Sequence, residues 1–245
     1  MNIHNRVLLI TGGTSGIGYA LVKKLASITK AIIVIARDAE KLNQLNNTHP
    51  HIYTYSCDIA NKVDLKSVLN HITEQHPDIS IVINNAGIQN TPTFLDEEFN
   101  PNSIDYEIAT NLVAPIQICA HMVGLLAKRS TNSAIINVTS GLGFYPKKNA
   151  AVYCATKAGL RNFTKSLRYQ LENTSINVID AILPLVDTPM TQGRGKGKIS
   201  TETAAIEIIS GIEKEKDEIY VGKTRWIPLL SRLSPSLTAS ILKAG

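Results

Sequence analysis

The sequence of 245 residues has little cysteine and few aromatic side chains, which make up 5% of the chain. Its three cysteines, Cys57, Cys119 and Cys154, are odd in number and form no CxxC pair. This pattern argues against a disulfide framework, so we expect buried thiols. The six histidines are scattered without HxxxH spacing, and no metal site is expected.

Long apolar runs are also missing, since no uninterrupted segment reaches the ~18 residues that a membrane-spanning helix needs. Only five residues precede the first strand-like run, at 6–10, which leaves no room for a signal peptide. We therefore expect a cytoplasmic protein. Hydrophobic residues make up 44% of the chain and charged residues 18%, as is ordinary for a globular protein with a core.

The formal net charge is +5, a sign that would permit a nucleic-acid partner. The basic residues are nevertheless dispersed, except between Arg194 and Lys198. A site for an anionic cofactor would use some of the same charge. We therefore expect no nucleic-acid function.

Short runs rich in isoleucine and valine recur along the chain and lack strict alternation, as is typical of strands buried on both faces of a parallel sheet. They lie at 6–10, 31–36, 52–57, 79–87, 133–141 and 176–184. Helical patterns separate them, as at 19–28 and 153–171. This order predicts a Rossmann-type, doubly wound parallel sheet in a three-layer α/β/α arrangement. With no repeat or linker, 1–245 is interpreted as a single domain.

The segment TGGTSGIG (11–18) follows the first strand and opens a helix. Glycine permits a tight turn and close approach of backbone N–H groups to a pyrophosphate, and the helix N-terminus attracts that anion. The position between strand and helix makes this motif far more specific than the same letters elsewhere. We expect the loop to bind a dinucleotide through Gly12, Thr14, Ser15, Gly16, Ile17 and Gly18.

The end of the second strand predicts which dinucleotide is bound. Ala36 stands where an acidic residue would take the ribose 2′-hydroxyl of NAD, and Arg37 follows it. An arginine here can make charge-assisted contacts to a 2′-phosphate, so the expected cofactor is NADP(H). The carboxylate of Asp38 could pair with Arg37, which weakens this prediction, and Ser15 adds no second positive charge.

Tyr153 and Lys157 lie four residues apart in a helical segment and therefore share one face. An ammonium beside a phenol favours the phenolate and lowers a pKa that is otherwise ~10. The pair could thus transfer a proton at a carbonyl or carbinol oxygen. The same spacing also arises by chance in exposed helical pairs, so the surrounding motifs decide its meaning.

Those motifs, TGxxxGxG, NNAG (84–87), TNLVAP, VTSG and YCATK, together resemble the classical short-chain dehydrogenase/reductase family over nearly the whole chain. The resemblance implies a catalytic set in which Ser140 contacts the substrate oxygen and Tyr153 is the acid/base. It further implies that Asn111 holds a water connecting Lys157 to solvent. Ser140 precedes Tyr153 by thirteen positions, as the family pattern requires.

The resemblance also implies further cofactor contacts. Asp58 would contact the adenine amino group with Ile59 beside the ring, although Asp58 could instead cap a helix at 61–72. The nicotinamide would be contacted through Val186 and Thr188, although LPLVDT lacks the usual Pro-Gly pair. The adenine ribose would be contacted through NNAG, that is, by Asn85, Ala86 and Gly87.

Within the family the chain resembles oxidoreductases found beside bacterial D-alanyl-lipoteichoic acid operons. The implied reaction is NADP(H)-dependent interconversion of a small-molecule carbonyl and an alcohol, in a homodimer or homotetramer. A catalytically silent, cofactor-binding regulatory protein is the alternative, and an extended-family epimerase or dehydratase fits the length and glycine spacing less well. Phe144 and Tyr145, after the catalytic serine, are expected to face the substrate.

Two segments stay open on the residues alone. Residues 189–203 could form a substrate lid, and the basic, glycine-rich part at 193–198 could favour an anionic substrate or be a solvated loop. Apolar residues recur at helical spacing near the C-terminus, with Pro228 and Pro235 between them. This tail either packs on the core or on another subunit, or lies on a membrane surface. Its apolar residues are Trp226, Leu230, Leu233, Leu237 and Ile241.

Overall fold

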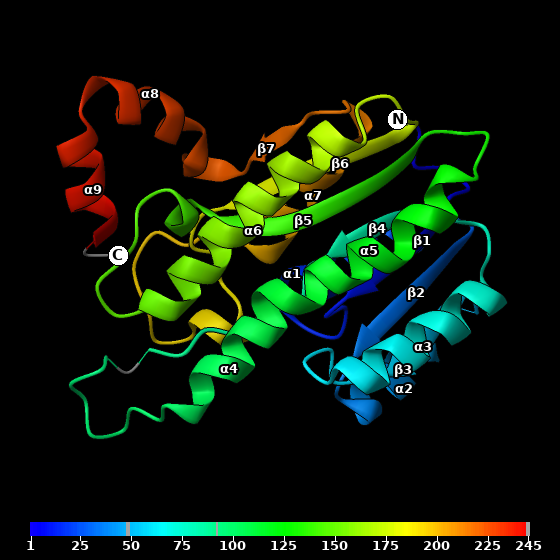
Figure 1. Ribbon diagram of the computed structural model, residues 1–245, viewed down its shortest axis with the longest axis horizontal. Coiled ribbons are helices and arrows are strands. Elements are labelled where there is room, and N and C mark those ends of the chain that lie inside the picture. The colour runs from blue at the N-terminus through cyan, green and yellow to red at the C-terminus, as the bar shows by residue number, and fades with distance from the viewer. Residues whose placement is uncertain (48–49, 92, 244–245) are drawn as a thin grey trace.

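The structure, a computed structural model, describes residues 1–47, 50–91 and 93–243. Seven parallel strands in these ranges form one sheet, in the order β3-β2-β1-β4-β5-β6-β7. This confirms the predicted Rossmann-type sheet (Figure 1). The strands are β1 (Val7–Thr11), β2 (Ala31–Ala36), β3 (Ile52–Ser56), β4 (Ile79–Asn84), β5 (Ser133–Ser140), β6 (Ile176–Leu183) and β7 (Glu218–Tyr220).

Six strands coincide with the apolar runs of the sequence to within a few residues. Their central members β1, β2, β4 and β5 are buried along their whole length, which explains why their sequences lack alternation. The edge strand β7 was not predicted. It has three residues, of which only Ile219 is buried, so its sequence carries too little apolar pattern to identify a strand.

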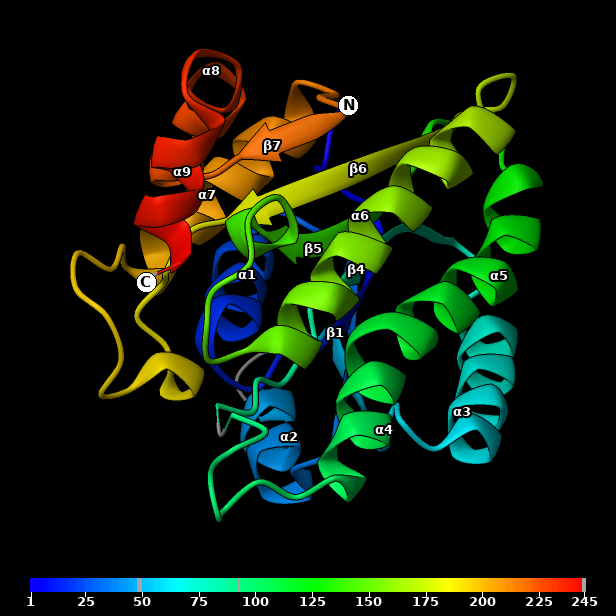
Figure 2. The ribbon, with the colours of Figure 1, turned by 60° about the vertical axis from the view of Figure 1, so that its left-hand side comes forward.

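Helices cover both faces of the sheet, as Figures 1 and 2 show. One face packs against α1, α2 and α7, and the other against α3, α5 and α6. The α-helices that precede the tail are α1 (Gly16–Leu25), α2 (Ala39–Asn46), α3 (Lys62–Gln75), α4 (Asn102–Ile108), α5 (Ala114–Ala127), α6 (Ala151–Gln170) and α7 (Thr201–Glu213). Short 3-10 or π turns occur at Ala109–Val113, Gly141–Gly143, Pro189–Thr191 and Gly222–Trp226.

The core is divided by the sheet into two apolar clusters. Leu21 and Leu25 of α1 join the first, as their helical spacing predicts, whereas Ile28 lies beyond the helix and is only partly buried. The three cysteines are buried free thiols, as expected. Cys119 on α5 belongs to the second cluster, and burial raises the pKa of its thiol to about 12.

The continuous helical stretch Asn102–Ala127 has the length of a segment that could cross a membrane, and its most apolar 18-residue window has a mean hydropathy of 1.5. It contains no uninterrupted apolar run of that length, because Asn111, Gln117 and His121 lie within it. Its residues Ile118 and Met122 are buried in the second core cluster. We therefore interpret this stretch as a core helix.

The C-terminal segment forms two short helices, α8 (Ile227–Leu233) and α9 (Pro235–Lys243), instead of one long amphipathic helix. Trp226 and Leu233 are exposed, so the expected apolar stripe is not fully covered within the described chain. The side chains of Leu237 and Ile241 lie outside the described residues. The backbone N–H of Lys148 donates to the carbonyl of Lys243 at 3.2 Å, which ties the tail to the loop after β5 (Figure 2).

The strand order indicates at which edge of the sheet a ligand would bind. The chain runs outward from β1 to β3 in one direction and from β4 to β7 in the other. In open parallel sheets, ligands bind outside the carboxyl ends of the strands at such a switch point. The loops after β1, β4 and β5 meet at this edge.

Candidate active site

The turn from β1 into α1 has the geometry of an anion-binding loop. Gly12 and Gly16 have φ values of +71° and +53°, which favour glycine. A Cβ on Gly12 would lie 3.0 Å from the Cα of Ala86, so the turn packs closely against the loop after β4. Ser15 precedes α1 in an extended conformation, and its side chain makes no capping hydrogen bond. The N-terminal amides of α1 thus border the pocket.

Gly18 has a different role from the one predicted. A Cβ on Gly18 would lie 2.1 Å from the carbonyl oxygen of Gly12 and 2.5 Å from Asn85 Nδ2. The residue is buried inside α1 and is not among the pocket-lining residues. Gly18 therefore lets the helix pack beneath the turn, and its predicted cofactor contact is indirect.

Asn85 holds the loop after β4 against the loop after β1. Its side-chain amide donates to the carbonyl of Thr11 at 3.0 Å, while the backbone N–H groups of Asn85 and Ala86 donate to Thr11 Oγ1, each at 3.1 Å. Asn85 thus fixes the switch point, and Asn85, Ala86 and Gly87 line the pocket as predicted.

At one end of the pocket, Arg37 belongs to a chain of hydrogen bonds. Its Nη1 donates to Tyr106 Oη at 2.5 Å, and that phenol donates to Asp58 Oδ2 at 2.8 Å. Asp58 does not cap α3, because Asn61 accepts the hydrogen bonds from Val63 and Asp64 at that helix start. The predicted Asp58 thus lies beside the predicted Arg37.

Asp38 does not pair with Arg37, which corrects the sequence-based concern. Its carboxylate caps α2 by accepting from the backbone of Lys41 and forms an ion pair with Lys41 Nζ at 2.7 Å. Both side chains also line the pocket. Lys41 was missed, although its position four residues after Arg37 at a helix start was an available signal. It is a second cation beside the pocket, paired with the Asp38 carboxylate.

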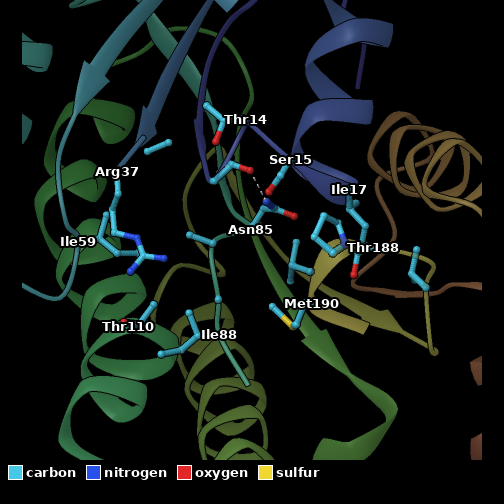
Figure 3. A pocket seen from close by; sticks show the side chains of 18 of the residues that line it. Thr14, Ser15, Ile17, Arg37, Ile59, Asn85, Ile88, Thr110, Thr188 and Met190 are labelled. Carbon is cyan, nitrogen blue, oxygen red and sulfur yellow. Dashed lines mark hydrogen bonds between the residues drawn. The ribbon is translucent and has the colours of Figure 1, made fainter. Parts of the chain in front are cut away.

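The pocket has a volume of about 580 Å³, within the range of cofactor sites. Figure 3 shows Arg37 and Ile59 on one side, Thr188 and Met190 on the opposite side, and Ser15 and Asn85 between them. Among the predicted residues, Gly18 and Asn111 do not line it. Those that do are Gly12, Thr14, Ser15, Gly16, Ile17, Arg37, Asp58, Ile59, Asn85, Ala86, Gly87, Ser140, Tyr153, Lys157, Val186 and Thr188.

Three predicted catalytic side chains meet at the other end. Ser140 closes β5, and Tyr153 and Lys157 come from the first turns of α6. The Lys157 ammonium donates to the carbonyl of Val138 at 2.8 Å and lies 5.7 Å from the centroid of the Tyr153 ring. Ser140 Oγ accepts from the N–H of Leu142 at 3.1 Å, which leaves the serine proton available for another acceptor.

The pKa of the phenol is not lowered, contrary to the sequence-based expectation. Burial raises the pKa of Tyr153 to about 12, and the hydrogen bond to Ser140 only partly offsets this. Burial also lowers the pKa of Lys157 to about 8, with the Asp180 charge acting in the opposite direction. The low polarity of the buried site therefore dominates both pKa values, and at neutral pH the phenol is protonated.

Asn111 lies behind the pocket in a π turn between α4 and α5. Its Oδ1 accepts from the N–H of Ile88 and its Nδ2 donates to the carbonyl of Ile88, both at 2.8 Å. Such π turns are frequent at functional sites. Asn111 fixes the pocket-lining Ile88, and its role in holding a water beside Lys157 stays a prediction.

A buried polar network supports the catalytic end of β5. Thr139 donates to Asp180 Oδ1, and Arg161 Nε donates to Asp180 Oδ2 at 2.9 Å. Arg161 Nη2 reaches Glu218 Oε1 on β7 at 2.8 Å. Asp180 is 2% exposed, so the Arg161 charge compensates a carboxylate that water does not reach. Sequence analysis missed this network because its members come from four separate elements.

Phe144 does not face the pocket, which corrects the expectation for that residue. Its ring lies 3.6 Å from the Arg161 guanidinium and 6.2 Å from the Tyr220 ring. Neither Phe144 nor Tyr145 is among the lining residues. Phe144 thus stabilises the network around Arg161, and the neighbouring Leu183 and Pro184 reach the pocket instead.

The segment after β6 lines the pocket and then folds back, so that Ile199 lies beside Val186. Val186 and Ile199 form a parallel β-bridge, and Lys198 Nζ reaches Asp187 Oδ1 at 3.2 Å and the carbonyl of Thr191 at 2.6 Å. The predicted lid, 189–203, extends too far, since α7 begins at Thr201. The loop between the bridged residues keeps the predicted glycines, which have positive φ values at 193, 195 and 197.

Comparison with known proteins identifies relatives over most of the chain. A family model described as short chain dehydrogenase matches residues 6–198. The uncharacterized oxidoreductase DltE of Bacillus subtilis (strain 168) is 35% identical over 228 residues, which cover 89% of each chain. This confirms the resemblance to oxidoreductases found beside D-alanyl-lipoteichoic acid operons.

Two further comparisons extend this result. The 3-oxoacyl-[acyl-carrier-protein] reductase FabG of Rickettsia felis is 30% identical over 188 residues, covering 75% of this chain and 73% of the relative. The solved structure of a short chain dehydrogenase from Burkholderia cenocepacia J2315 in complex with NADP superposes with a TM-score of 0.88 over 100% of both chains, at 24% identity. With its glycine turn, its Tyr153–Lys157 pair and a family match over most of its length, the chain is an oxidoreductase that belongs to the short chain dehydrogenase family.

Proposed function

We propose that this chain interconverts a carbonyl compound and an alcohol with NADP(H), using Tyr153 as the acid/base. The observation that carries the proposal is one continuous pocket. It joins the glycine turn and Arg37 at one end to Ser140, Tyr153 and Lys157 at the other. A dinucleotide needs contacts over that whole length, and hydride transfer needs its reactive end beside a proton donor.

The residues present fit an NADP(H) molecule. Gly12 and Gly16 have the positive φ values that the tight turn needs, and the N-terminus of α1 suits the pyrophosphate. Arg37 and Lys41 offer positive charge at the end where the 2′-phosphate would lie. The NADP complex of the Burkholderia cenocepacia relative supports the same choice.

When bound, the cofactor supplies the hydride, and the protein supplies orientation and proton transfer. Ser140 donates a hydrogen bond to the substrate carbonyl oxygen, because its own oxygen is already engaged by Leu142. Tyr153, protonated at neutral pH, gives its phenolic proton to that oxygen as the carbon is reduced. The Lys157 ammonium, anchored on Val138, offsets the phenolate charge that remains.

Turnover and nucleotide binding must be measured together to test this proposal. NADPH absorbance would be followed with a panel of aldehydes and ketones, in the parent chain and in Tyr153→Phe. We expect the parent to oxidise NADPH and Tyr153→Phe to lose ~10²–10⁴ in rate while it binds NADPH nearly as well. Retention of most of the rate by Tyr153→Phe would refute the role of this tyrosine. Binding of NADPH without turnover of any carbonyl would favour a regulatory protein.

We further propose a homo-oligomeric state in the cytoplasm. Two large apolar side chains on separate helices, Tyr169 of α6 and Ile206 of α7, are 60% and 53% exposed. Because α6 and α7 cover opposite faces of the sheet, these side chains would take part in two separate contacts between copies, and burial of each would favour association. Light scattering after size-exclusion chromatography would test this, and a strictly monomeric mass would contradict it.

A further inference from the structure

Two cations lie on separate loops that adjoin the pocket, outside the residues that line it. Lys147 belongs to the loop between Ser140 and Tyr153, and Arg194 to the loop between Val186 and Ile199. Each loop is adjacent in sequence to catalytic or pocket-lining residues. The sequence has three cations between residues 193 and 198, and the structure gives them different surroundings.

Arg194 is held beside the pocket by two contacts. Its backbone N–H donates to the carbonyl of Thr191, a lining residue, at 3.0 Å. Its Nη1 donates to Gln89 Oε1 at 2.9 Å, and Gln89 follows the lining residue Ile88. The guanidinium carries further donors that this amide does not use. By contrast, Lys198 is engaged by Asp187 and Thr191, and Lys196 is exposed.

Lys147 is a buried cation, with 8% of its surface exposed. Within the part of the chain that the structure describes, no hydrogen bond or salt bridge to its ammonium is found. Its backbone contacts the thiol of Cys154, the residue after Tyr153. Burial and the nearby Arg194 charge both lower the pKa of the Lys147 ammonium. Two like charges brought together at a low-polarity site repel one another, and an anion between them would relieve this cost.

We propose that Lys147 and Arg194 together bind an anionic group of the substrate, so that the enzyme acts on carbonyl compounds bearing a carboxylate, sulfonate or phosphate. The inference rests on the proposed function and names its substrate class. Lysine and arginine both donate to such oxyanions, and charge-assisted hydrogen bonds of this kind are the strong ones. Lys147 and Arg194 would hold the anionic group while the carbonyl group of the same substrate reaches Ser140 and Tyr153.

A matched pair of aldehydes tests the proposal. 4-Oxobutanoate carries a carboxylate, and its methyl ester has the same carbon chain without the charge. We expect the parent enzyme to show a kcat/KM for the acid that is ~10–100-fold higher than for the ester, as one or two charge-assisted hydrogen bonds would give. Lys147→Met and Arg194→Met should each reduce that ratio ~10-fold, mainly through KM for the acid, and leave the ester nearly unchanged. Lys196→Met, on the same loop, is the control and should keep the parent ratio.

A binding measurement separates this inference from the proposed function. Succinate has no aldehyde group and so cannot be reduced. It would be titrated calorimetrically into each protein with NADP⁺ present. We expect the parent and Lys196→Met to bind succinate more tightly than Lys147→Met and Arg194→Met do. Equal use of acid and ester, or equal succinate affinity in all four proteins, would overturn the anion site while leaving the carbonyl chemistry intact. Absence of any NADPH-dependent turnover alongside the expected succinate pattern would overturn the proposed function alone.

Discussion

Tyr106 joins Arg37 to Asp58, since its phenol accepts from the guanidinium at 2.5 Å and donates to the carboxylate at 2.8 Å. The phenol thus sits between two residues predicted to bind opposite sides of the same nucleoside. Asp58 also raises the pKa of Tyr106, after the larger effect of burial, so the proton stays on the phenol and continues to favour this arrangement.

Arg37→Ala should reduce the preference for NADPH over NADH by ~10-fold or more, because it removes a charge-assisted contact to the 2′-phosphate. Affinity for NADH should change little. Titration of both cofactors, followed by fluorescence, gives the ratio. Lys62→Ala removes one exposed positive charge on α3 and serves as the control. If both variants keep the parent ratio, Arg37 does not select the cofactor.

Tyr106→Phe should have a smaller effect on the same ratio, because the ring and its packing against Arg37 are kept. The variant frees both Arg37 and Asp58 from one fixed partner. We expect a fall of up to ~5-fold in affinity for NADPH, which is less than one full hydrogen bond to a charged group contributes. A larger loss than in Arg37→Ala would show that the phenol itself contacts the cofactor.

Asp180→Asn should destabilise the fold by about 3 kcal/mol, because it leaves the Arg161 guanidinium near a buried site without its main counter-charge. Turnover should fall as well, since Thr139 beside Ser140 loses its carboxylate acceptor. Chemical denaturation measures the first effect and NADPH oxidation the second. Glu218→Gln alters the outer, more exposed partner of Arg161 and should cost less than ~1 kcal/mol. Equal losses in the two variants would contradict the importance of the buried carboxylate.

The Lys157 ammonium should make the free energy of unfolding depend on pH in a defined window. Its pKa is about 8 in the folded chain and 10.5 in the unfolded one, so the unfolded state binds more protons between these values. Stability of the parent relative to Lys157→Met should therefore rise from pH 8 to pH 10. Below pH 8 the difference should be flat. Tyr153, whose raised pKa contributes above pH 10, is present in both proteins, so its effect cancels in the difference. Denaturant curves at pH 7, 8.5 and 9.5 measure this, and a falling difference over that range would contradict the assignment.

Much of the fold followed from the sequence because a parallel sheet buried on both faces leaves continuous apolar runs. β2, for example, has the predicted bounds, 31–36. β7 was not predicted, because Ile219 is the one buried residue of this strand and the strand forms by pairing with β6. The π turn at Asn111 was not predicted either, since the hydrogen bonds between Asn111 and Ile88 depend on tertiary packing.

The candidate site divides along similar lines. Gly12, Ser140, Tyr153 and Lys157 were found because their chemistry requires fixed residue types at fixed spacings. The direction of the Tyr153 pKa was wrong because a spacing shows which charges are near but not how strongly the surroundings exclude water. Tyr106 and Lys147 were missed because tertiary packing alone brings Tyr106 to Arg37 and Asp58 and buries Lys147.

The bridge between Val186 and Ile199 has a consequence for how this protein could change its substrates. Because this bridge joins the two ends of the loop, the part that does not line the pocket, residues 192–197, can vary in length and sequence without transmitting strain to β6 or α7. Residues 192–197 can therefore be exchanged while Ser140, Tyr153 and Lys157 stay in place. Exchange of residues 192–197 for a loop of another composition should therefore yield folded enzymes that keep the hydride chemistry and accept different molecules.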